Sequence, residues 1–279
     1  MSSVLVCRGG QSQALRVGVS SVAVVCLILF ALDVDPTHRL VLAANRDEFH
    51  RRRSAAVHRR DDLQVIGGRD LEAGGTWLGL APDGHRLAAV TNVRDGIAQP
   101  QPDKRSRGGL PVDFVTGADS AADAAAALVA TADRYAPVNL LVDDGAEMWW
   151  ATNHLEPRAV RVEPGIHGLS NGALDEPWPK VTAGIATLTG ALTSSFPSSS
   201  DPEALLDALH DTTVAEDAAL PHTGVPLDNE RALSAMFVDM GEYGTRASTV
   251  VRVASVGHGD ITERRYTPNQ GPSTVAISV

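Results

Sequence analysis

A cysteine and a run of polar side chains lie at matching ends of two neighbouring apolar segments. Cys26 begins the segment Cys26–Leu32, and Asn-Arg-Asp-Glu, residues 45–48, ends the segment that follows. A cysteine thiol is a nucleophile once it is ionised, and a guanidinium beside it favours the thiolate. The combination of Cys26 with Arg46 therefore indicates covalent attack on an amide or related carbonyl group, as in an amide hydrolase or an acyltransferase.

The two segments have the pattern of a β-hairpin. The residues between them, 33–38, supply Asp, Pro and Thr, which are common in turns. A turn centred in this stretch pairs Cys26 with Asn45 and places it beside Arg46. The hairpin therefore predicts that the thiol and the guanidinium are neighbours.

The chain terminus is a second source of activation for a cysteine nucleophile. If Cys26 were the first residue, its α-amine, with an ordinary pKa of about 7.7–8.0, would act as the base that takes the thiol proton. The side-chain amides of Asn92 and Asn171 would donate hydrogen bonds to the oxyanion that forms when a carbonyl is attacked. Such a site needs no metal ion and no organic cofactor.

Each of these residues also has a structural interpretation. A cysteine in an apolar strand is commonly a small core residue. Arg46, Asp47 and Glu48 could form a structural cluster of ion pairs where a strand meets a loop. Asparagine is frequent at strand ends and in turns, which is where Asn92 and Asn171 stand. Residue types alone leave both interpretations open.

Further alternating and helical patterns fill the rest of the chain. A second hairpin joins residues 75–80 to 87–92. Helices are predicted at 121–135, 202–209 and 229–238, and strands at 138–142, 147–152, 158–163, 249–255, 261–267 and 273–279. Hairpins at both ends with helices between them predict one α+β domain, residues 26–279, in which helices cover antiparallel sheets.

The overall composition bounds the class of protein. The chain has 279 residues, 43% of them hydrophobic, which is enough for one large domain with its own core. Its net charge of −10 argues against a surface for nucleic-acid phosphates. The two cysteines, Cys7 and Cys26, have neither the number nor the spacing of a disulfide framework or a zinc site. These features favour a small-molecule ligand, without nucleic acid or metal.

The first 25 residues do not fit the predicted domain. Residues 17–32 form an apolar run like that of a signal peptide or membrane anchor, but the run lacks an A-x-A cleavage site and is short for a bilayer span. A lipoprotein signal would place a small residue before Cys26, where this chain has Val25. The preferred interpretation is an extension, residues 1–25, in front of the true start, because the valine codon GUG also serves as a start codon. A cytoplasmic protein without a membrane segment, beginning at Cys26, is then expected.

Six stretches in one order resemble the NRDE family, which includes transport and Golgi organisation protein 2. They are ANRDEF, GGRDLEAGGTWLGL, AAVTNVRD, SRGGLPVDF, HGLSNGALDEPWPKV and YGTRASTVV, and they cover Val25 to about Val253. That family more distantly resembles the N-terminal nucleophile hydrolases of the bile-salt and penicillin amidase kind. The resemblance implies an αββα sandwich of antiparallel sheets covered by helices. It also implies a cysteine that directly follows the initiator methionine, a pattern from which the 25-residue extension departs.

The resemblance implies roles for particular residues. Cys26 matches the nucleophile, and Asn92 and Asn171 match two asparagines that bind the oxyanion. Arg46 and Arg246 match an early and a late arginine of the same site, so their guanidinium groups are predicted to lie close together. Two arginines converging on one pocket indicate an anionic group on the ligand.

Other residues of the same motifs are predicted to contact the substrate. Asp47 or Glu48 would supply the carboxylate near the α-amine, and Asn45, Arg69 and Trp77 would bind the substrate. Trp77 has a competing interpretation as a core residue.

A non-catalytic protein that binds a ligand is the competing function. Eukaryotic relatives in the resembled family are associated with haem trafficking and secretory-pathway organisation, so haem is the alternative ligand. Cys26, His50, His58, His154 or His167 would then contact it, although the chain has no C-x-x-C-H haem motif. Both functions would retain the same fold and pocket, so the sequence does not decide between them.

Overall fold

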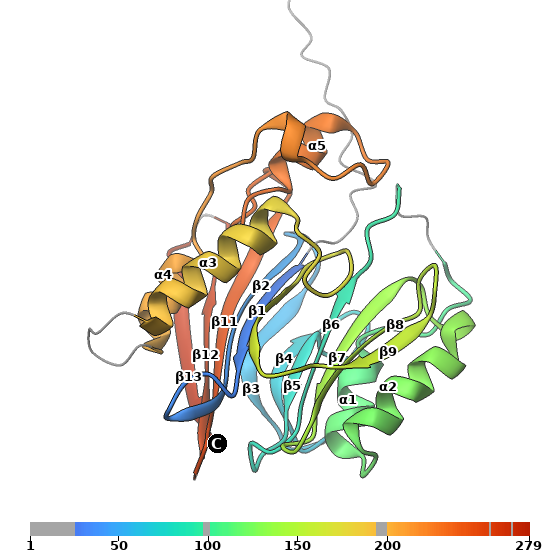
Figure 1. The fold of residues 1–279 in the computed structure, drawn as a ribbon, viewed down its shortest axis with the longest axis vertical. Coiled ribbons are helices and arrows are strands. Elements are labelled where there is room, and N and C mark those ends of the chain that lie inside the picture. The colour runs from blue at the N-terminus through green and yellow to red at the C-terminus, as the bar shows by residue number, and fades with distance from the viewer. Residues whose placement is uncertain (1–25, 97–100, 194–199, 257, 269) are drawn as a thin grey trace, which may run out of the picture.

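Two antiparallel β-sheets face each other in the computed structural model (Figure 1), which describes residues 26–96, 101–193, 200–256, 258–268 and 270–279. Among these residues, the strands of the first sheet follow the order β10-β1-β2-β11-β12-β13. They are β10 (Gly165–Leu169), β1 (Cys26–Leu32), β2 (His38–Phe49), β11 (Tyr243–Ala254), β12 (Gly259–Arg265) and β13 (Ser273–Ser278). Because β2 pairs with β11, the early and late parts of the chain meet in this sheet.

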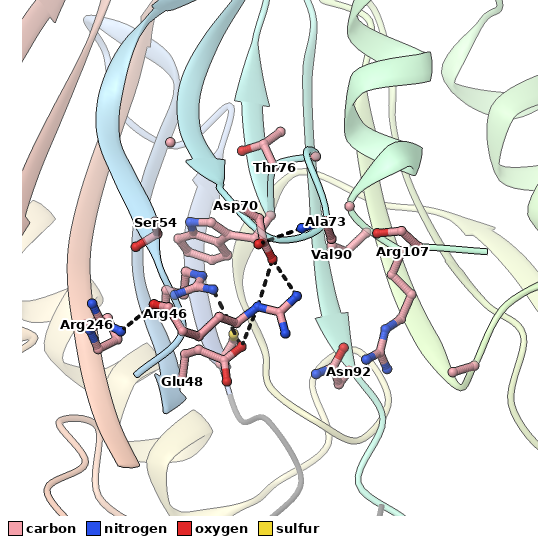
Figure 2. A pocket seen from close by; sticks show the side chains of 18 of the residues that line it. Arg46, Glu48, Ser54, Asp70, Ala73, Thr76, Val90, Asn92, Arg107 and Arg246 are labelled. Atoms are coloured by element: carbon pink, nitrogen blue, oxygen red, sulfur yellow. Dashed lines mark hydrogen bonds and ion pairs between the residues drawn. The ribbon is translucent and has the colours of Figure 1, made fainter. Parts of the chain in front are cut away.

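The second sheet is a meander whose strands follow the order of the sequence, from β3 to β9. They are β3 (Ser54–Arg60), β4 (Val65–Asp70), β5 (Leu78–Leu80), β6 (Leu87–Asn92), β7 (Val138–Asp143), β8 (Met148–Thr152) and β9 (Arg158–Arg161). Each strand pairs with the next in an antiparallel arrangement. The polar tips of β4 and β6 thereby come close to the ends of β1 and β2 in the first sheet (Figure 2).

Helices cover the outer face of each sheet (Figure 1). The helices α1 (Gly109–Thr116) and α2 (Ala121–Ala130) pack on the second sheet, and α3 (Pro179–Thr193) and α4 (Pro202–Ala208) pack on the first. The short helices η1 (Ala132–Arg134), η2 (Asp217–Ala219) and α5 (Leu227–Ala232) lie in connecting segments. The protein is therefore an α+β domain built from two antiparallel sheets with helices outside them, as the sequence predicted.

Alternate residues of β1 and β2 face two different cores, because successive side chains of a strand point to opposite faces. The core between the two sheets receives Ile28, Phe30, Leu32, Leu40, Leu42 and Ala44. The core under α3 and α4 receives Leu27, Leu29, Ala31, Val41 and Ala43. Even-numbered residues of these strands thus point between the sheets, and odd-numbered residues point toward the helices.

The register of the first hairpin differs by one residue from the predicted one. Cys26 pairs with Arg46, and Leu27 pairs with Asn45, so the predicted pairing of Cys26 with Asn45 was wrong. The turn sets this register: the Asp35 carboxylate accepts hydrogen bonds from the backbone N–H groups that follow it, two and three residues later. The thiol and the guanidinium are still neighbours, now directly opposite each other on two strands.

Several predicted boundaries also change. The predicted helix 229–238 is only α5, because the N–H of Phe237 donates to the carbonyl of Asp211 and the N–H of Val238 donates to Oγ1 of Thr245, which takes this segment out of the helix. The predicted helix 121–135 ends at Ala130 and continues as η1. The sequence patterns missed β3, β4, α1, β10 and α3 altogether.

The N-terminal extension, residues 1–25, lies outside the described residues. The apolar residues that follow it, Cys26–Leu32, are the buried strand β1. Within the described part of the chain, none of the helices combines the length and the apolar composition that a membrane crossing needs.

Candidate functional site

A cavity of about 680 Å³ opens between the two sheets where β1, β2, β4 and β6 end. The Cys26 thiol lines it from β1, Arg46 and Glu48 line it from β2, and Asn92 lines it from the end of β6. In Figure 2, Asn92 and Arg107 occupy the side of the cavity opposite Arg46 and Glu48. The cavity is large enough for a small-molecule ligand.

The Asn-Arg-Asp-Glu run divides between the two faces of β2. Arg46 and Glu48 point into the cavity, in line with the even-numbered residues that precede them. Asn45 and Asp47 point to the helix side and do not line the cavity. Their predicted role as substrate-binding residues was wrong, because a strand cannot present four consecutive side chains on one face.

Asn45 has a structural role on the helix side of the sheet. Its Nδ2 donates to the carbonyls of Leu209 and Met236 at 3.0 and 2.8 Å. Its Oδ1 accepts a hydrogen bond of 2.6 Å from Oγ of Ser248 on β11. These bonds satisfy the buried amide and tie the segments after α4 and α5 to the sheet.

Cations outnumber carboxylates in the wall of the cavity. The cationic lining residues are Arg46, Arg52, Arg69, Lys104, Arg105, Arg107, Arg246 and Arg265. The acidic ones are Glu48, Asp70, Asp95 and Glu263. The chain as a whole has a net charge of −10, so this local excess of positive charge stands out and favours an anionic ligand.

The Cys26 thiol is protonated at neutral pH in this environment. Only 4% of the residue is exposed, and burial, together with the negative charge of Asp47, raises its pKa to about 12. A backbone hydrogen bond from Asp47 and the charges of Arg46 and Lys180 act in the opposite direction, but they are outweighed. Arg46 does lower the pKa of the thiol, as predicted, but its effect is smaller than the effect of burial.

Lys180, near the start of α3, is a buried charge that sequence reasoning missed. It is 2% exposed, and among the described residues its Nζ has no hydrogen-bond partner. Burial lowers its pKa to about 8, against the opposing effect of Asp47. Burial likewise raises the pKa of Asp47 to about 6, although Lys180 opposes this shift. A sequence signal did exist, because Lys180 is one of only two lysines in the chain and stands in the motif DEPWPKV.

The two predicted oxyanion asparagines have different positions. Asn92 lines the cavity together with Cys26. Asn171 instead lines a second cavity of about 390 Å³, and its Nδ2 donates to the carbonyl of Asn92 at 2.7 Å. Asn171 was predicted to donate to the oxyanion as well, but it does not line the cavity that contains Cys26, and its amide binds the backbone of Asn92 instead.

The two predicted arginines do share one site. Arg46 and Arg246 both line the cavity, and the charge of Arg46 contributes to lowering the pKa of Arg246, after burial. Arg246 also has a structural role, since its Nη1 donates to the carbonyls of Phe49, His50 and Arg52 at 2.9 to 3.1 Å. It therefore holds the loop after β2 as well as adding positive charge to the cavity.

Arg69 and Trp77 line the cavity, and Trp77 also packs against two of the apolar cores. None of the described lining residues is a histidine. His167 uses both ring nitrogens elsewhere, on the Asp175 carboxylate at 2.7 Å and on the Glu163 carbonyl at 2.9 Å. His154 lines the second cavity instead. His50 and His58 are also absent from the lining of the first cavity. The described residues contain no cluster of three or more His, Cys, Asp or Glu side chains that could hold a metal ion.

A close approach of two glycines fixes the loop that carries Arg107. A Cβ atom on Gly75 would lie 2.3 Å from the carbonyl oxygen of Gly108, which is far too short a contact. At this point the carbonyl of Gly108 accepts a hydrogen bond of 3.0 Å from the N–H of Thr76. The glycine in GGTW is thus required because the loop before α1 lies directly on it.

Gly75→Ala should therefore destabilise the protein, because the loop before α1 must move to admit a methyl group. We expect the free energy of unfolding in urea to fall by about 1–3 kcal/mol, which is typical of overpacking. Gly109→Ala is the matched control, since a Cβ there has nothing within 4 Å and Ala favours the helix. Equal stability of Gly75→Ala and the native protein would show that the loop adapts freely.

The fold and the site together define an α+β protein with a cysteine in a cation-rich cavity between two sheets. The model of the family described as Transport and Golgi organisation 2 matches residues 25–268. The Transport and Golgi organization 2 homolog of Mus musculus is 33% identical over 261 residues, 86% of this chain and 92% of that protein. The homolog of Homo sapiens is 33% identical over 263 residues with the same coverage, and the Drosophila melanogaster protein is 40% identical over 108 residues, 34% of this chain and 36% of that protein. The chain belongs to the Transport and Golgi organisation 2 family, which confirms the resemblance carried by its six motifs.

Proposed function

We propose that this protein is a cysteine-nucleophile hydrolase or acyltransferase that acts on a small amide or related carbonyl substrate. The observation that carries the proposal is the location of Cys26 at the tip of β1, where its side chain lines the polar cavity and not the closed apolar core. A nucleophile in that position has space in front of it for a substrate of ordinary metabolite size. The excess of arginine in the wall supports an anionic substrate.

The reaction would proceed through a thioester. The Cys26 sulfur attacks the carbonyl carbon, and the electron pair of the C=O bond moves onto oxygen, where the Asn92 amide donates a hydrogen bond. The intermediate then collapses and breaks the C–N bond, and the amine leaves with the proton that came from the thiol. Water attacks the thioester in a hydrolase, and a second amine does so in an acyltransferase, which releases the acid or the new amide and restores the thiol.

The base in this proposal is the α-amine of Cys26 in a chain whose first residue is Cys26. The thiol needs a base because its pKa is raised to about 12. An α-amine has an ordinary pKa of about 7.7–8.0, so a substantial part of it is unprotonated near neutral pH. The working protein would then lack residues 1–25.

The pH dependence of Cys26 alkylation should differ between the two chains. In the 279-residue chain carrying Cys7→Ser, the thiolate fraction rises about tenfold per pH unit below the pKa of about 12, so the rate with iodoacetamide should still be climbing at about pH 10. In a chain that begins at Cys26, the rate should level off near the pKa of the amine, about 8. Intact-mass measurements give both rates. A plateau below about pH 9 in the longer chain would contradict a thiol held in its protonated form.

Non-catalytic ligand binding is the second candidate function, and the raised pKa of Cys26 favours it. A protonated, buried thiol contributes shape to the cavity and no nucleophile. Under this alternative the arginines and Asn92 bind the ligand, and Cys26 is the cavity residue that would contact haem iron, since histidine is absent from the described lining. Coordination to haem iron would require loss of the thiol proton, so haem added to the protein would give a thiolate-type absorbance spectrum that Cys26→Ala abolishes. An unchanged spectrum of free haem in both proteins would exclude haem as the ligand.

A further inference from the structure

Arg107 differs from the other cations of the cavity in what it binds. It lies directly before α1, is partly buried, and donates from Nη1 to the carbonyl of Pro137 at 3.2 Å. Among the described residues no carboxylate lies within ion-pair distance of Arg107, and the charges of Cys26 and Glu48 oppose the lowering of its pKa only in part. Burial is the larger effect and lowers the pKa of Arg107, so Arg107 is a partly desolvated cation without a counter-charge in direct contact.

Most neighbouring cations already have partners. Arg52 pairs with Asp70 at 2.7 Å, and Arg265 donates to the carbonyl and hydroxyl of Ser54. Arg69 and Arg105 have looser ion pairs of 3.8 Å with Asp62 and Asp113. The remaining cations are Lys104, which donates to the carbonyl of Asp133, and Arg246, which donates to three carbonyls. Two cations of the wall remain, Arg107 and Arg46, and of these Arg107 has no ion pair among the described residues.

Arg46 adds a second set of unused donors close to the thiol. Its Nη2 is 3.5 Å from Glu48, a long ion pair, and among the described residues its Nη1 has no hydrogen-bond partner although it is buried. Arg46 stands directly opposite Cys26 on the neighbouring strand. Arg107 approaches from the other side of the cavity (Figure 2). The cavity that contains the thiol thus has guanidinium donors on two sides: Arg46 directly opposite Cys26, and Arg107 across the cavity.

We infer that Arg107 and Arg46 bind a carboxylate group of the substrate, so that the carbonyl attacked by Cys26 belongs to an amide that also carries a free carboxylate. The inference rests on the proposed function and names its substrate class. A carboxylate matches the planar fork of a guanidinium, and each such charge-assisted bond is stronger than a neutral one. The contact of Gly75 with Gly108 holds the Arg107 loop in place before the substrate arrives.

Alkylation with a charged and a neutral reagent tests this inference on the 279-residue chain with Cys7→Ser. Iodoacetate carries a carboxylate and iodoacetamide does not, and both consume the same thiolate, so the ratio of their rates is independent of the thiol pKa. We expect Arg107→Gln to lower the ratio of the iodoacetate rate to the iodoacetamide rate by about tenfold or more. Arg134→Gln is the matched control, since Arg134 is exposed and lines neither cavity, and it should change the ratio by less than about twofold at physiological salt, where distant charges are screened. An equal ratio in Arg107→Gln and the parent chain would overturn the inference.

A binding measurement without the thiol separates this inference from the proposed function. N-acetylglycine and its neutral amide are titrated by calorimetry into the 279-residue chain with Cys26→Ala, and into the same chain with Arg107→Gln added. We expect N-acetylglycine to bind more tightly than the amide, and Arg107→Gln to weaken its binding by about tenfold. Equal affinity for the two compounds, or no binding of either, would overturn the carboxylate site. Inertness of Cys26 toward acylating reagents would instead count against the proposed reaction and leave this binding result intact.

Discussion

A chain that begins at Cys26 releases a rapid burst of about one equivalent of 4-nitrophenolate from 4-nitrophenyl acetate, and its Cys26→Ala variant releases none. The burst is expected because the first half of the proposed reaction forms an acetyl thioester faster than water removes it. Loss of a nucleophile costs several orders of magnitude in rate, about 10³-fold or more. Absorbance of the released 4-nitrophenolate in a stopped-flow instrument gives both the amplitude and the rate.

The serine variant and the stability of the fold are the controls for this experiment. Cys26→Ser keeps the shape of the tip of β1 and a group that the same α-amine can activate, so a slow trace of acylation should remain. Both variants should unfold within about 1 kcal/mol of the native protein, because the side chain changes little in volume. A burst of the same size in Cys26→Ala would show that another group is acylated. The non-catalytic alternative would then be preferred.

The sequence predicted correctly those site residues whose position follows from the alternation of side chains along a strand. Cys26 and Arg46 both point between the sheets, and the hairpin made them neighbours even with the register off by one residue. Asn45 and Asp47 were misplaced because the motif was treated as a block rather than as alternating residues of one strand. The alternation along β2 before this motif already distinguishes the two faces: Leu42 and Ala44 pack between the sheets, and Ala43 packs under the helices. Continuing that alternation places Asn45 and Asp47 on the helix side.

Helix α3 could not be recognised from local propensity. Its sequence, PKVTAGIATLTGALT, contains two glycines and several β-branched residues, which are poor helix formers. Tertiary packing explains one of these glycines, because a Cβ on Gly184 would lie 2.6 Å from both methyl groups of Leu29 on β1. The close packing of α3 against β1 requires glycine there, and it also brings Lys180 under the sheet. Sequence analysis therefore missed Lys180 because it missed the helix that carries it.

Lys180→Met should be strongly destabilising at neutral pH, because it removes the positive charge that partly compensates the buried Asp47 carboxylate. Asp47 Oδ1 accepts a hydrogen bond of 2.6 Å from Thr245, but among the described residues its Oδ2 has no partner. Removing one member of a buried pair of charges typically costs about 3–5 kcal/mol. Urea unfolding at about pH 7 measures the loss. Lys104→Met is the matched control, since this lysine is exposed and should change the free energy of unfolding by no more than about 0.5 kcal/mol.

The dependence of stability on pH identifies the two charges themselves. Burial raises the pKa of Asp47 from 3.8 to about 6, so the folded state holds this proton more tightly, and stability from this group is lost as pH rises through that interval. Burial lowers the pKa of Lys180 from 10.5 to about 8, so the folded state holds that proton more weakly, and stability from this group is gained as pH rises from about 8 to 10.5.

The double variant Asp47→Asn with Lys180→Met lacks both groups and serves as the reference for measuring their effect. Relative to that double variant, the native protein should lose stability from about pH 4 to 6, be weakest between about pH 6 and 8, and regain stability above about pH 8. A difference that is constant over this range would mean that Asp47 and Lys180 titrate at their ordinary values, and a difference that is largest near neutral pH would mean that the folded state favours the charged pair.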